Sequence, residues 1–399
     1  MGTGEFSLFI TTRTDGLNEV ENNVFDICYA IIWHYFCGII LNYSFHLIMP
    51  KTMKKLLTIL LIILINVKIN AQTNTQTGPA YGFLNIGTDA RHGGTGDAGV
   101  ASPSDATDFI YNPSKSAFAE TKFRLFLSPH NPWLSNIAKD INFRRFAAFY
   151  KLDDKNALSA NFTHFNQGAT VFNNSIGQAI GAYKSYEWTV GVNFSRKILP
   201  KLSVGIGLKY VKSSLLNGLP ASLGFVIPSP SNLAADVSLY HHNTDETKFF
   251  RFDYGFYLSN IGGKVNYESL GNLPMPTNLR IGTGTLIRWA PKHKTIGLVD
   301  VNKLLLPNDG IIETFKGYSV SVGAEYWYDD TYAVRLGTTG NSNVNYGNSF
   351  LTTGLGVKIN NLVELDFAYL MDGSESKISG NLWRVNVSAG FGKIKSKNE

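Results

Sequence analysis

Residues 86–101 read IGTDARHGGTGDAGVA, and the segment runs on to Tyr111, Asn112 and Pro113. It is densely punctuated by glycine and shows no periodicity. Closely spaced glycines suit a backbone that turns tightly or passes close to other backbone, because glycine carries no Cβ. A long series of alternating segments follows. We therefore interpret the stretch as a segment that folds back into, or seals, a barrel formed by the rest of the chain.

The same stretch contains a spacing that is typical of dinucleotide-binding proteins. Gly94, Gly96 and Gly99 read as G-x-G-x-x-G. That fingerprint requires a strand before it, a helix after it and an acidic residue about twenty positions further on, within a βαβ unit. The downstream segments have an antiparallel pattern, so this unit is missing. We interpret the three glycines as structural, and we predict no cofactor.

The composition is typical of a transmembrane β-barrel. Of the 399 residues, 13% are aromatic, only 17% are charged and 38 are glycine. Such a chain is poor in surface charge for a soluble protein, yet its main body holds no long apolar helical span. A barrel meets both conditions, because only alternate residues of each strand face the lipid.

Residues 53–71 have the features of a secretory signal peptide: a basic start, an apolar core and a small residue, Ala71, before the expected cleavage. Residues 1–52 have no place upstream of such a signal. We interpret them as a doubtful N-terminal extension, with Met53 as the true start. The alternative is a membrane anchor formed by residues 27–41, which are apolar but short for a membrane span.

Cysteine and charge exclude further classes of function. Cys28 and Cys37 are the two cysteines and both fall in the doubtful extension. The exported chain is therefore expected to form no disulfide, zinc cluster or thiol nucleophile. The formal net charge is +6, and basic residues cluster only in the tail, residues 393–399. Nucleic acid is therefore not an expected partner.

From Lys122 onward, apolar residues recur at every second position, which predicts strands with one apolar and one polar face. The clearest examples are residues 186–195, 202–210, 251–259, 319–326, 363–369 and 383–391. Segments of about ten residues or more suit tilted membrane strands rather than ordinary globular ones. The polar faces carry charged residues, which a packed sandwich core would not tolerate unpaired.

The connections alternate in length, which favours a barrel of about fourteen strands. Short joins fall at residues 153–155, 199–200, 243–245, 290–292, 329–330 and 360–361, and long ones at 129–140, 167–184, 214–231, 262–276, 305–316, 340–348 and 372–380. Short turns of such barrels face the periplasm and long loops face outside. The sequence thus predicts a plug on the periplasmic side (72–121), an outer-membrane barrel (122–392) and a periplasmic tail (393–399).

No catalytic or metal-binding motif is found, so we predict neither a catalytic residue nor a metal site, and no enzyme activity. His241 and His242 are adjacent on a strand and point to opposite faces, so they are not expected to share a metal. The candidate residues lie in the plug, where charges are expected to tie it to polar residues of the lumen. They are Asp89, Arg91, Gly93, Gly94, Gly96, Asp97, Gly99, Asn112 and Pro113.

The first long loop is a second candidate, as a contact for a partner protein. It contains Pro132, Trp133 and Leu134, and Pro129 stiffens it further. An exposed Trp in a stiff loop is suited to binding another protein. Packing of the same ring on the barrel rim is the alternative, and the sequence leaves both open.

Several motifs follow one another along the chain: residues 87–101, Asn112-Pro113, and residues 118–123, 132–134, 150–154, 195–197, 259–262, 273–280 and 300–305. Together they resemble the PorV family, an outer-membrane component of the type IX secretion system of Bacteroidetes. The resemblance covers about residues 78–392. Ser114 departs from it, because the family usually has Ala there, and residues 1–52 have no counterpart.

The resemblance implies a non-enzymatic barrel of fourteen strands, related to the FadL fatty-acid transporters. Family members bind the folded C-terminal signal domain of secreted cargo as it leaves the translocon. They then carry it to an attachment complex with a sortase-like protease, which joins the cargo to surface lipopolysaccharide. Two alternatives stay open: a FadL-like transporter of hydrophobic small molecules, which needs an apolar lumen pocket, and a barrel enzyme, which needs a Ser/His constellation near one rim.

Overall fold

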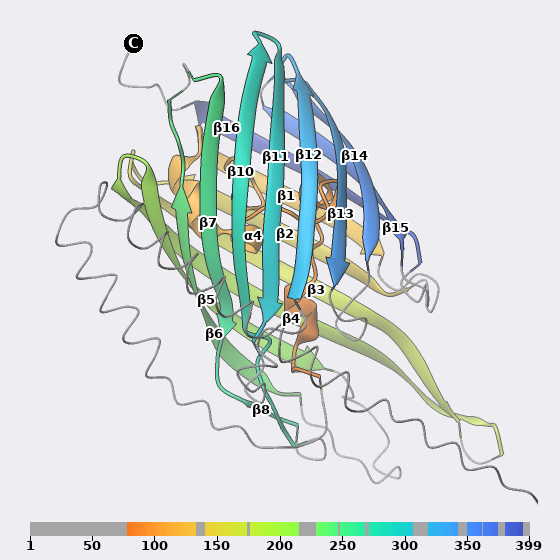
Figure 1. Cartoon of the computed structure of the whole chain (residues 1–399). Helices are drawn as coiled ribbons and strands as arrows, with labels where there is room; N and C mark the ends of the chain where they lie inside the picture. The colour runs from red at the N-terminus through yellow and green to blue at the C-terminus, as the bar shows by residue number, and fades with distance from the viewer. Residues whose placement is uncertain are drawn as a thin grey trace, which may run out of the picture. The chain divides into compact units, whose positions relative to one another are not determined.

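Strands form where the sequence alternates, because each strand has lipid on one side and the lumen on the other. The computed structural model of the protein describes residues 78–132, 140–173, 176–214, 229–245, 248–267, 271–305, 318–341, 349–360, 362–373 and 380–393. Within them, fourteen strands form a closed barrel (Figure 1). These are β1 (Thr121–Pro132), β2 (Asn142–Lys151), β3 (Asn156–Asn173), β4 (Ala179–Leu199), β5 (Leu202–Ser214), β6 (Ser231–His241), β7 (Phe250–Ile261), β10 (Asn278–Ala290), β11 (His293–Leu304), β12 (Tyr318–Tyr328), β13 (Tyr332–Asn341), β14 (Phe350–Ile359), β15 (Val363–Asp372) and β16 (Leu382–Lys393).

Every barrel strand pairs antiparallel with its neighbours along the chain, and β1 closes the barrel against β16 with Phe123 opposite Phe391. Closure leaves no open sheet edge, which a lipid environment requires. A separate two-stranded sheet, β8 (Val265–Asn266) with β9 (Asn272–Leu273), lies in the connection between β7 and β10. The predicted antiparallel barrel of about fourteen strands is confirmed. Among the described residues, helices are all too short or too polar to cross a membrane.

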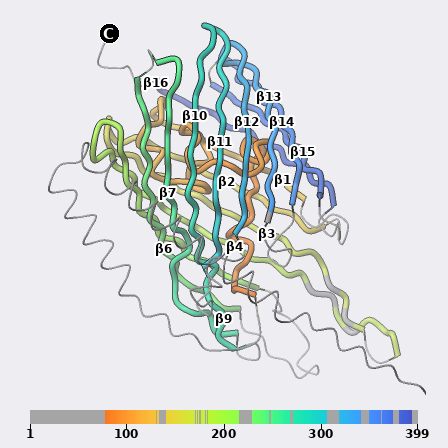
Figure 2. The backbone as a smooth tube through the Cα atoms, in the orientation of Figure 1, coloured from red at the N-terminus to blue at the C-terminus, as the bar shows by residue number. Residues whose placement is uncertain are grey.

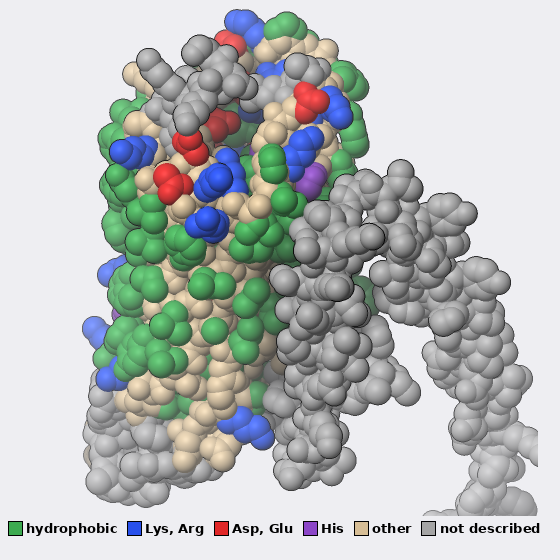
Figure 3. Space-filling model, turned by 90° about the vertical axis from the view of Figure 1, so that its left-hand side faces the viewer, with side chains coloured by type: hydrophobic (Ala, Val, Ile, Leu, Met, Phe, Trp, Pro, Cys, Tyr) green, Lys and Arg blue, Asp and Glu red, His purple; other side chains and the backbone are tan. Residues whose placement is uncertain are grey.

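The two faces of each strand differ as the alternation predicted. In β4, Val190 and Val192 are 44% and 48% exposed, whereas Thr189 and Asn193 on either side of them are buried. Figure 3 shows apolar side chains spread over the middle of the outer wall, with charged side chains gathered near one end. The outer wall is therefore suited to lipid and the inner wall is polar, which is the arrangement of an outer-membrane barrel.

One predicted loop is largely strand. We expected residues 167–184 to form a long connection, but β3 and β4 continue to pair as far as Asn173 opposite Ala179. A register shift interrupts the ladder between Asn166 and Ala169, and Gly168 has a φ of +85°. A β-bulge of this kind breaks the period of two while backbone pairing continues. Alternation alone therefore does not reveal the strands in this segment.

The segment before the barrel forms four short helices that lie inside it (Figure 2). They are η2 (Gly82–Asn85), α3 (Ala90–Gly93), α4 (Asp108–Tyr111) and η3 (Pro113–Phe118). We call residues 78–120 the plug. Its side chains are mostly buried, and it contacts strands around the barrel, from β2 to β16. The expectation that the glycine-rich segment folds back into the barrel is therefore met by the described residues.

The plug crosses the lumen from the long-loop end to the short-turn end. Its beginning lies beside the long connection after β7, where the Ala80 amide donates to the Pro274 carbonyl at 2.9 Å. Its end lies among short turns, where Phe118 contacts His242 and Lys197. The assignment of residues 72–121 to the periplasmic side stays a prediction. A segment that seals a wide lumen has to span it.

The signal peptide, the extension at residues 1–52 and the tail beyond Lys393 lie outside the described residues. They stay predictions from the sequence.

Candidate functional site

The plug turns are fixed by side chains that cap its helices. The Asp89 carboxylate accepts a hydrogen bond from the His92 amide at 2.7 Å, at the start of α3. The Asn112 side chain accepts from the Ser114 amide at 3.2 Å, and Pro113 occupies the first position of η3. Asp and Asn are preferred caps because they satisfy amides that lack partners within the helix, and Pro has no amide to satisfy there.

Glycine permits the plug to press its backbone against the barrel wall. Gly323 on β12 and Gly337 on β13 both lie against Thr95, and a Cβ at either position would collide with the Thr95 backbone. Gly96 has a φ of +71°, and a Cβ there would collide with the backbone of Thr338. The glycines of the plug and those of the wall therefore meet at one close backbone contact.

Arg91 joins the plug to the wall. Its Nη2 lies 2.9 Å from Glu325 Oε1 on β12, and its Nη1 lies 2.8 Å from Asp105 Oδ2 within the plug. All three side chains are buried. Arg91 Nε also donates to Glu325 Oε2 at 3.0 Å, so the contact with the wall is bidentate. A buried charge is tolerated only when it is paired and hydrogen-bonded, so this contact fixes the plug position.

Two further arginines complete the network from the wall. The fully buried Arg335 contacts Glu325 at 2.5 Å and Asp366 at 2.7 Å, on β12 and β15. Arg384 on β16 contacts Asp97 of the plug at 2.6 Å. We call Arg91, Asp97, Glu325, Arg335, Asp366 and Arg384 the ion-pair network. The alternation had placed Glu325, Asp366 and Arg384 on polar strand faces, but it had not indicated their partners.

Asp300 on β11 holds the glycine-rich turn by its backbone. Its Oδ2 accepts from the Gly99 amide at 2.6 Å and from the Val100 amide at 2.9 Å. Within the plug, the buried Lys115 donates to the Gly99 carbonyl at 2.9 Å and lies 3.2 Å from Asp108. Sequence reasoning missed Asp300 and Lys115 as plug contacts, since neither stands in a pattern that reveals a distant partner.

The plug carboxylates are tuned by burial and by their neighbours. Burial alone would raise the pKa of Asp89, but the charge and hydrogen bonds of His92 outweigh it and lower that pKa to about 2. The pKa of Asp105 is also lowered, since His92 and Arg91 overcome its burial. Burial dominates at Asp108 and raises its pKa. At neutral pH, Asp89 and Asp105 are therefore charged partners of the plug.

Of the candidates derived from the sequence, the structure describes the nine plug residues and Pro132. All nine plug candidates lie in the lumen, and Gly93 and Gly94 abut Arg384 and Gly354 of the wall. Pro132 ends β1 at the long-loop end, whereas Trp133 and Leu134 lie outside the described residues. The nine plug candidates therefore form one site in the lumen, and the loop contact stays a prediction.

The two adjacent histidines point apart. His241 stacks on Tyr254, at 4.4 Å between ring centroids, whereas His242 Nδ1 lies 3.1 Å from Asp253. In the part of the chain that the structure describes, no three His, Cys, Asp or Glu side chains are grouped to hold a metal ion.

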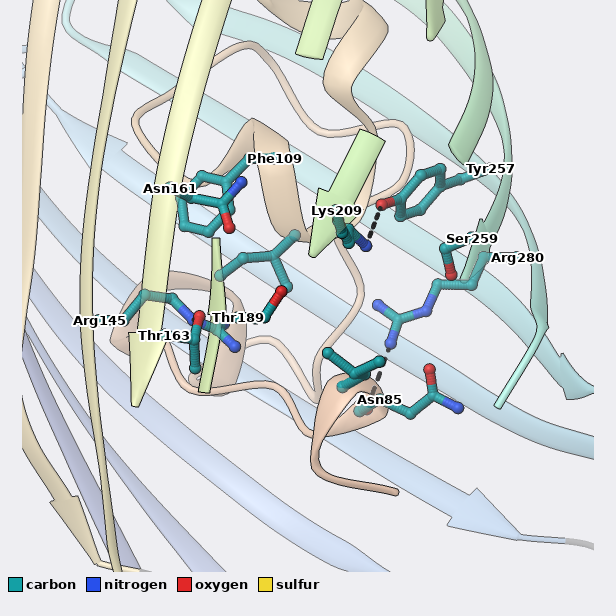
Figure 4. Close-up of a pocket in the computed structure, with 12 residues that line it drawn as sticks. Asn85, Phe109, Arg145, Asn161, Thr163, Thr189, Lys209, Tyr257, Ser259 and Arg280 are labelled. Carbon is teal, nitrogen blue, oxygen red and sulfur yellow. Dashed lines mark hydrogen bonds between the residues drawn. The ribbon is translucent and has the colours of Figure 1, made fainter. Parts of the chain in front are cut away.

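A small polar cavity lies between the plug and the wall strands β2 to β10 (Figure 4). Its volume is about 30 Å³. Plug residues on one side include Leu84, Asn85 and Phe109, and wall residues on the other include Arg145 and Arg280. This space is far below the ~300–1,000 Å³ of pockets that enclose drug-sized molecules.

A closed antiparallel barrel with an apolar outer wall, a polar lumen and an internal plug defines the class of this molecule: it is an outer-membrane β-barrel protein. The toluene transporter TodX of Pseudomonas putida has a similar fold, with a TM-score of 0.50 at 13% identity over 77% of this chain and 99% of that chain. A Pseudomonas aeruginosa FadL homologue has a TM-score of 0.41 at 10% identity over 77% of this chain and 99% of that chain. At such identities the likeness concerns the fold alone.

The family follows from the sequence comparison. The family model for "Type IX secretion system protein PorV" matches residues 68–310, more than half of the chain. The chain therefore belongs to the PorV family and is an outer-membrane component of type IX secretion. The curated proteins give no match.

Proposed function

We propose that the protein is a non-enzymatic carrier of secreted cargo. It binds the C-terminal signal domain of the cargo at its long-loop end, receives it from the type IX translocon and delivers it to the attachment complex with the sortase-like protease. The observation that carries this proposal is a plug tied across the lumen of a PorV-family barrel. Because the plug fills the lumen, we expect cargo binding to take place at an end of the barrel.

The long-loop end offers a stiff platform for a protein partner. Phe143 and Phe165 stack there with their ring centroids 4.2 Å apart, and Phe83 of the plug packs on Phe165. Tyr81 and Tyr267 belong to the same buried cluster. Recognition loops work best on a rigid scaffold, because less conformational freedom is lost on binding. The loop that begins at Pro132, with Trp133 and Leu134, is the proposed contact.

Deletion of the gene, followed by complementation, tests the carrier role. The expected result is that cargo with the C-terminal signal fails to reach the surface without the protein and returns with the wild-type chain. Normal surface attachment in the deletion strain would overturn the proposal.

Site-specific crosslinking tests the proposed contact. A photo-crosslinking residue at position 133 is expected to capture the cargo signal domain, whereas one at Lys292, in a short turn at the other end, is not. Equal capture from both positions would exclude a specific contact at the long-loop end.

The transporter of hydrophobic small molecules is disfavoured by the lumen. Such a transporter needs an apolar pocket of substrate size, but the cavity measures about 30 Å³ and is lined by Arg145, Lys209 and Arg280. Uptake assays with a radiolabelled long-chain fatty acid are expected to give equal rates with and without the protein.

A further inference from the structure

The luminal cavity collects positive charge without matching negative charge. Three cationic side chains line it, Arg145 from β2, Lys209 from β5 and Arg280 from β10, and its described lining includes no carboxylate. As whole residues, Arg145 is 5% exposed and Lys209 and Arg280 are each 9% exposed. Charges this far from water are costly unless an opposite charge lies beside them.

Lys209 has its partner, but the two arginines do not. Lys209 Nζ lies 2.9 Å from Asp236 Oδ2 and donates to Asn260 Oδ1 at 3.0 Å. Arg280 Nη2 donates a long 3.5 Å bond to the Asn85 carbonyl, its Nε lies 3.1 Å from the Asn278 side-chain amide, and its guanidinium lies over the ring of Tyr111. No ion pair joins Arg280 to a carboxylate of the described chain. Asp300 on β11 is near enough for the two charges to attract, but the two side chains form no ion pair.

Arg145 is the clearest case. Its side chain is 5% exposed, its Nε donates to Thr163 Oγ1 at 2.8 Å, and its Nη1 has no hydrogen-bond partner among the described residues. Its guanidinium lies 5.8 Å from the centroid of the Phe109 ring, which supplies no charge. In Figure 4 Arg145 and Arg280 stand on opposite sides of the cavity and point into it. Two guanidinium groups thus face one small space.

We propose that this cavity binds a small oxyanion, of the carboxylate or phosphate type, between Arg145 and Arg280. Guanidinium groups match the oxygen geometry of both. Thr163 accepts from Arg145 and keeps its own hydroxyl proton to donate to the anion. The cavity volume of about 30 Å³ holds about two waters or one small oxyanion group. The plug residues Asn85 and Phe109 line the same space, so the anion also stabilises the closed plug. This proposal does not rest on cargo binding.

Calorimetric titration of the purified full chain in non-ionic detergent tests the site. Inorganic phosphate and acetate are the probes, in a chloride buffer of constant ionic strength. We expect saturable binding of at least one probe, weakened about 10- to 100-fold in Arg145→Gln because a charge-assisted contact is lost. Lys292→Gln, which removes an exposed cation of a short turn, is the matched control and should bind like the wild type. Equal affinity in Arg145→Gln and wild type, or no saturable binding in the wild type, overturns the proposal.

A second arm identifies the source of the anion. Short-chain phosphatidylglycerol, below its micellar concentration, is compared with inorganic phosphate. Tighter binding of the lipid assigns the site to a headgroup, and tighter or equal binding of phosphate assigns it to a free ion.

A crystal structure of the wild type, soaked in bromoacetate, keeps the test independent of any variant that fails to fold. An anomalous bromine signal beside Arg145 and Arg280 supports the proposal, and a cavity that contains only water overturns it.

Discussion

Buried arginines are compensated differently on the two sides of the lumen. On the side of β12 to β16, Arg335 contacts two carboxylates and Arg384 contacts Asp97 of the plug. On the side of β2 to β10, Arg145 and Arg280 face a cavity without a carboxylate. On the first side each arginine has a carboxylate partner and these pairs fix the plug, although Arg335 Nη2 and Glu364 Oε1 have no hydrogen-bond partner among the described residues. On the second side, Arg145 and Arg280 lie without carboxylate partners beside the cavity, which indicates a ligand site rather than a contact that fixes the plug.

The largest expected effect comes from breaking the ion-pair network. Arg335→Met leaves Glu325 and Asp366 buried without their central partner. Removing one member of a buried ion pair costs about 3–5 kcal/mol, so the free energy of unfolding should fall by that amount. Urea unfolding in lipid vesicles measures it. Lys292→Gln is the control, because its pair with Asp329 is exposed and should contribute nothing measurable. Equal effects of the two substitutions would contradict the interpretation.

The next effect tests the close backbone contact of the plug. Gly337→Ala places a Cβ against Thr95, whereas Gly340→Ala on the same strand meets nothing within 4 Å. Overpacking of this kind costs about 1–3 kcal/mol, and here it pushes the plug away from the wall. Planar-bilayer recordings should show greater ion conductance for Gly337→Ala than for wild type. Matching conductance in Gly337→Ala and Gly340→Ala would mean that the plug is not held by this contact.

A pH series tests the carboxylate that caps α3. The pKa of Asp89 is lowered to about 2 in the folded plug, so its contribution is complete above its ordinary pKa and is lost as the pH falls towards 2. The shift corresponds to about 2 kcal/mol. Asp89→Asn should therefore be less stable than wild type at pH 6, with the difference shrinking as the pH approaches 2. A difference that stays constant across this range would exclude the charge as its cause.

The smallest expected effect belongs to the side with the cavity. In buffer without phosphate or carboxylates, Arg145→Gln loses one hydrogen bond to Thr163 but also removes an unpaired buried charge. The two terms oppose each other, so the free energy of unfolding should change by less than about 1 kcal/mol. Urea unfolding beside Arg335→Met measures the contrast. A loss as large as that of Arg335→Met would show that Arg145 already has a partner within the chain.

Much of the barrel could be predicted because lipid imposes a local rule. Val190 and Val192 face outwards and Glu187 and Asn193 face inwards in the structure, as their alternation indicated. The alternation fails at Gly168, where a bulge shifts the register, and there the predicted loop was wrong. Local pattern thus predicts a strand only while its pairing stays regular.

The plug site could be predicted only in part. The glycine-rich stretch indicated close backbone contact, and the contacts of Gly96 with the wall are of this kind. Its partners could not be predicted, since Arg91 and Glu325 are 234 residues apart in sequence. The direction in which the plug crosses the lumen is likewise absent from any local pattern.

The sequence by itself determined the strands, their inward and outward faces, the alternation of short and long connections and the membership of the PorV family. These depend on neighbours in the chain and on the contrast between lipid and water. The tertiary structure alone decided that Arg91 meets Glu325 and that Arg145 and Arg280 face one cavity. Closure of the barrel places distant strands around one plug. Only this arrangement decides which buried charges are paired.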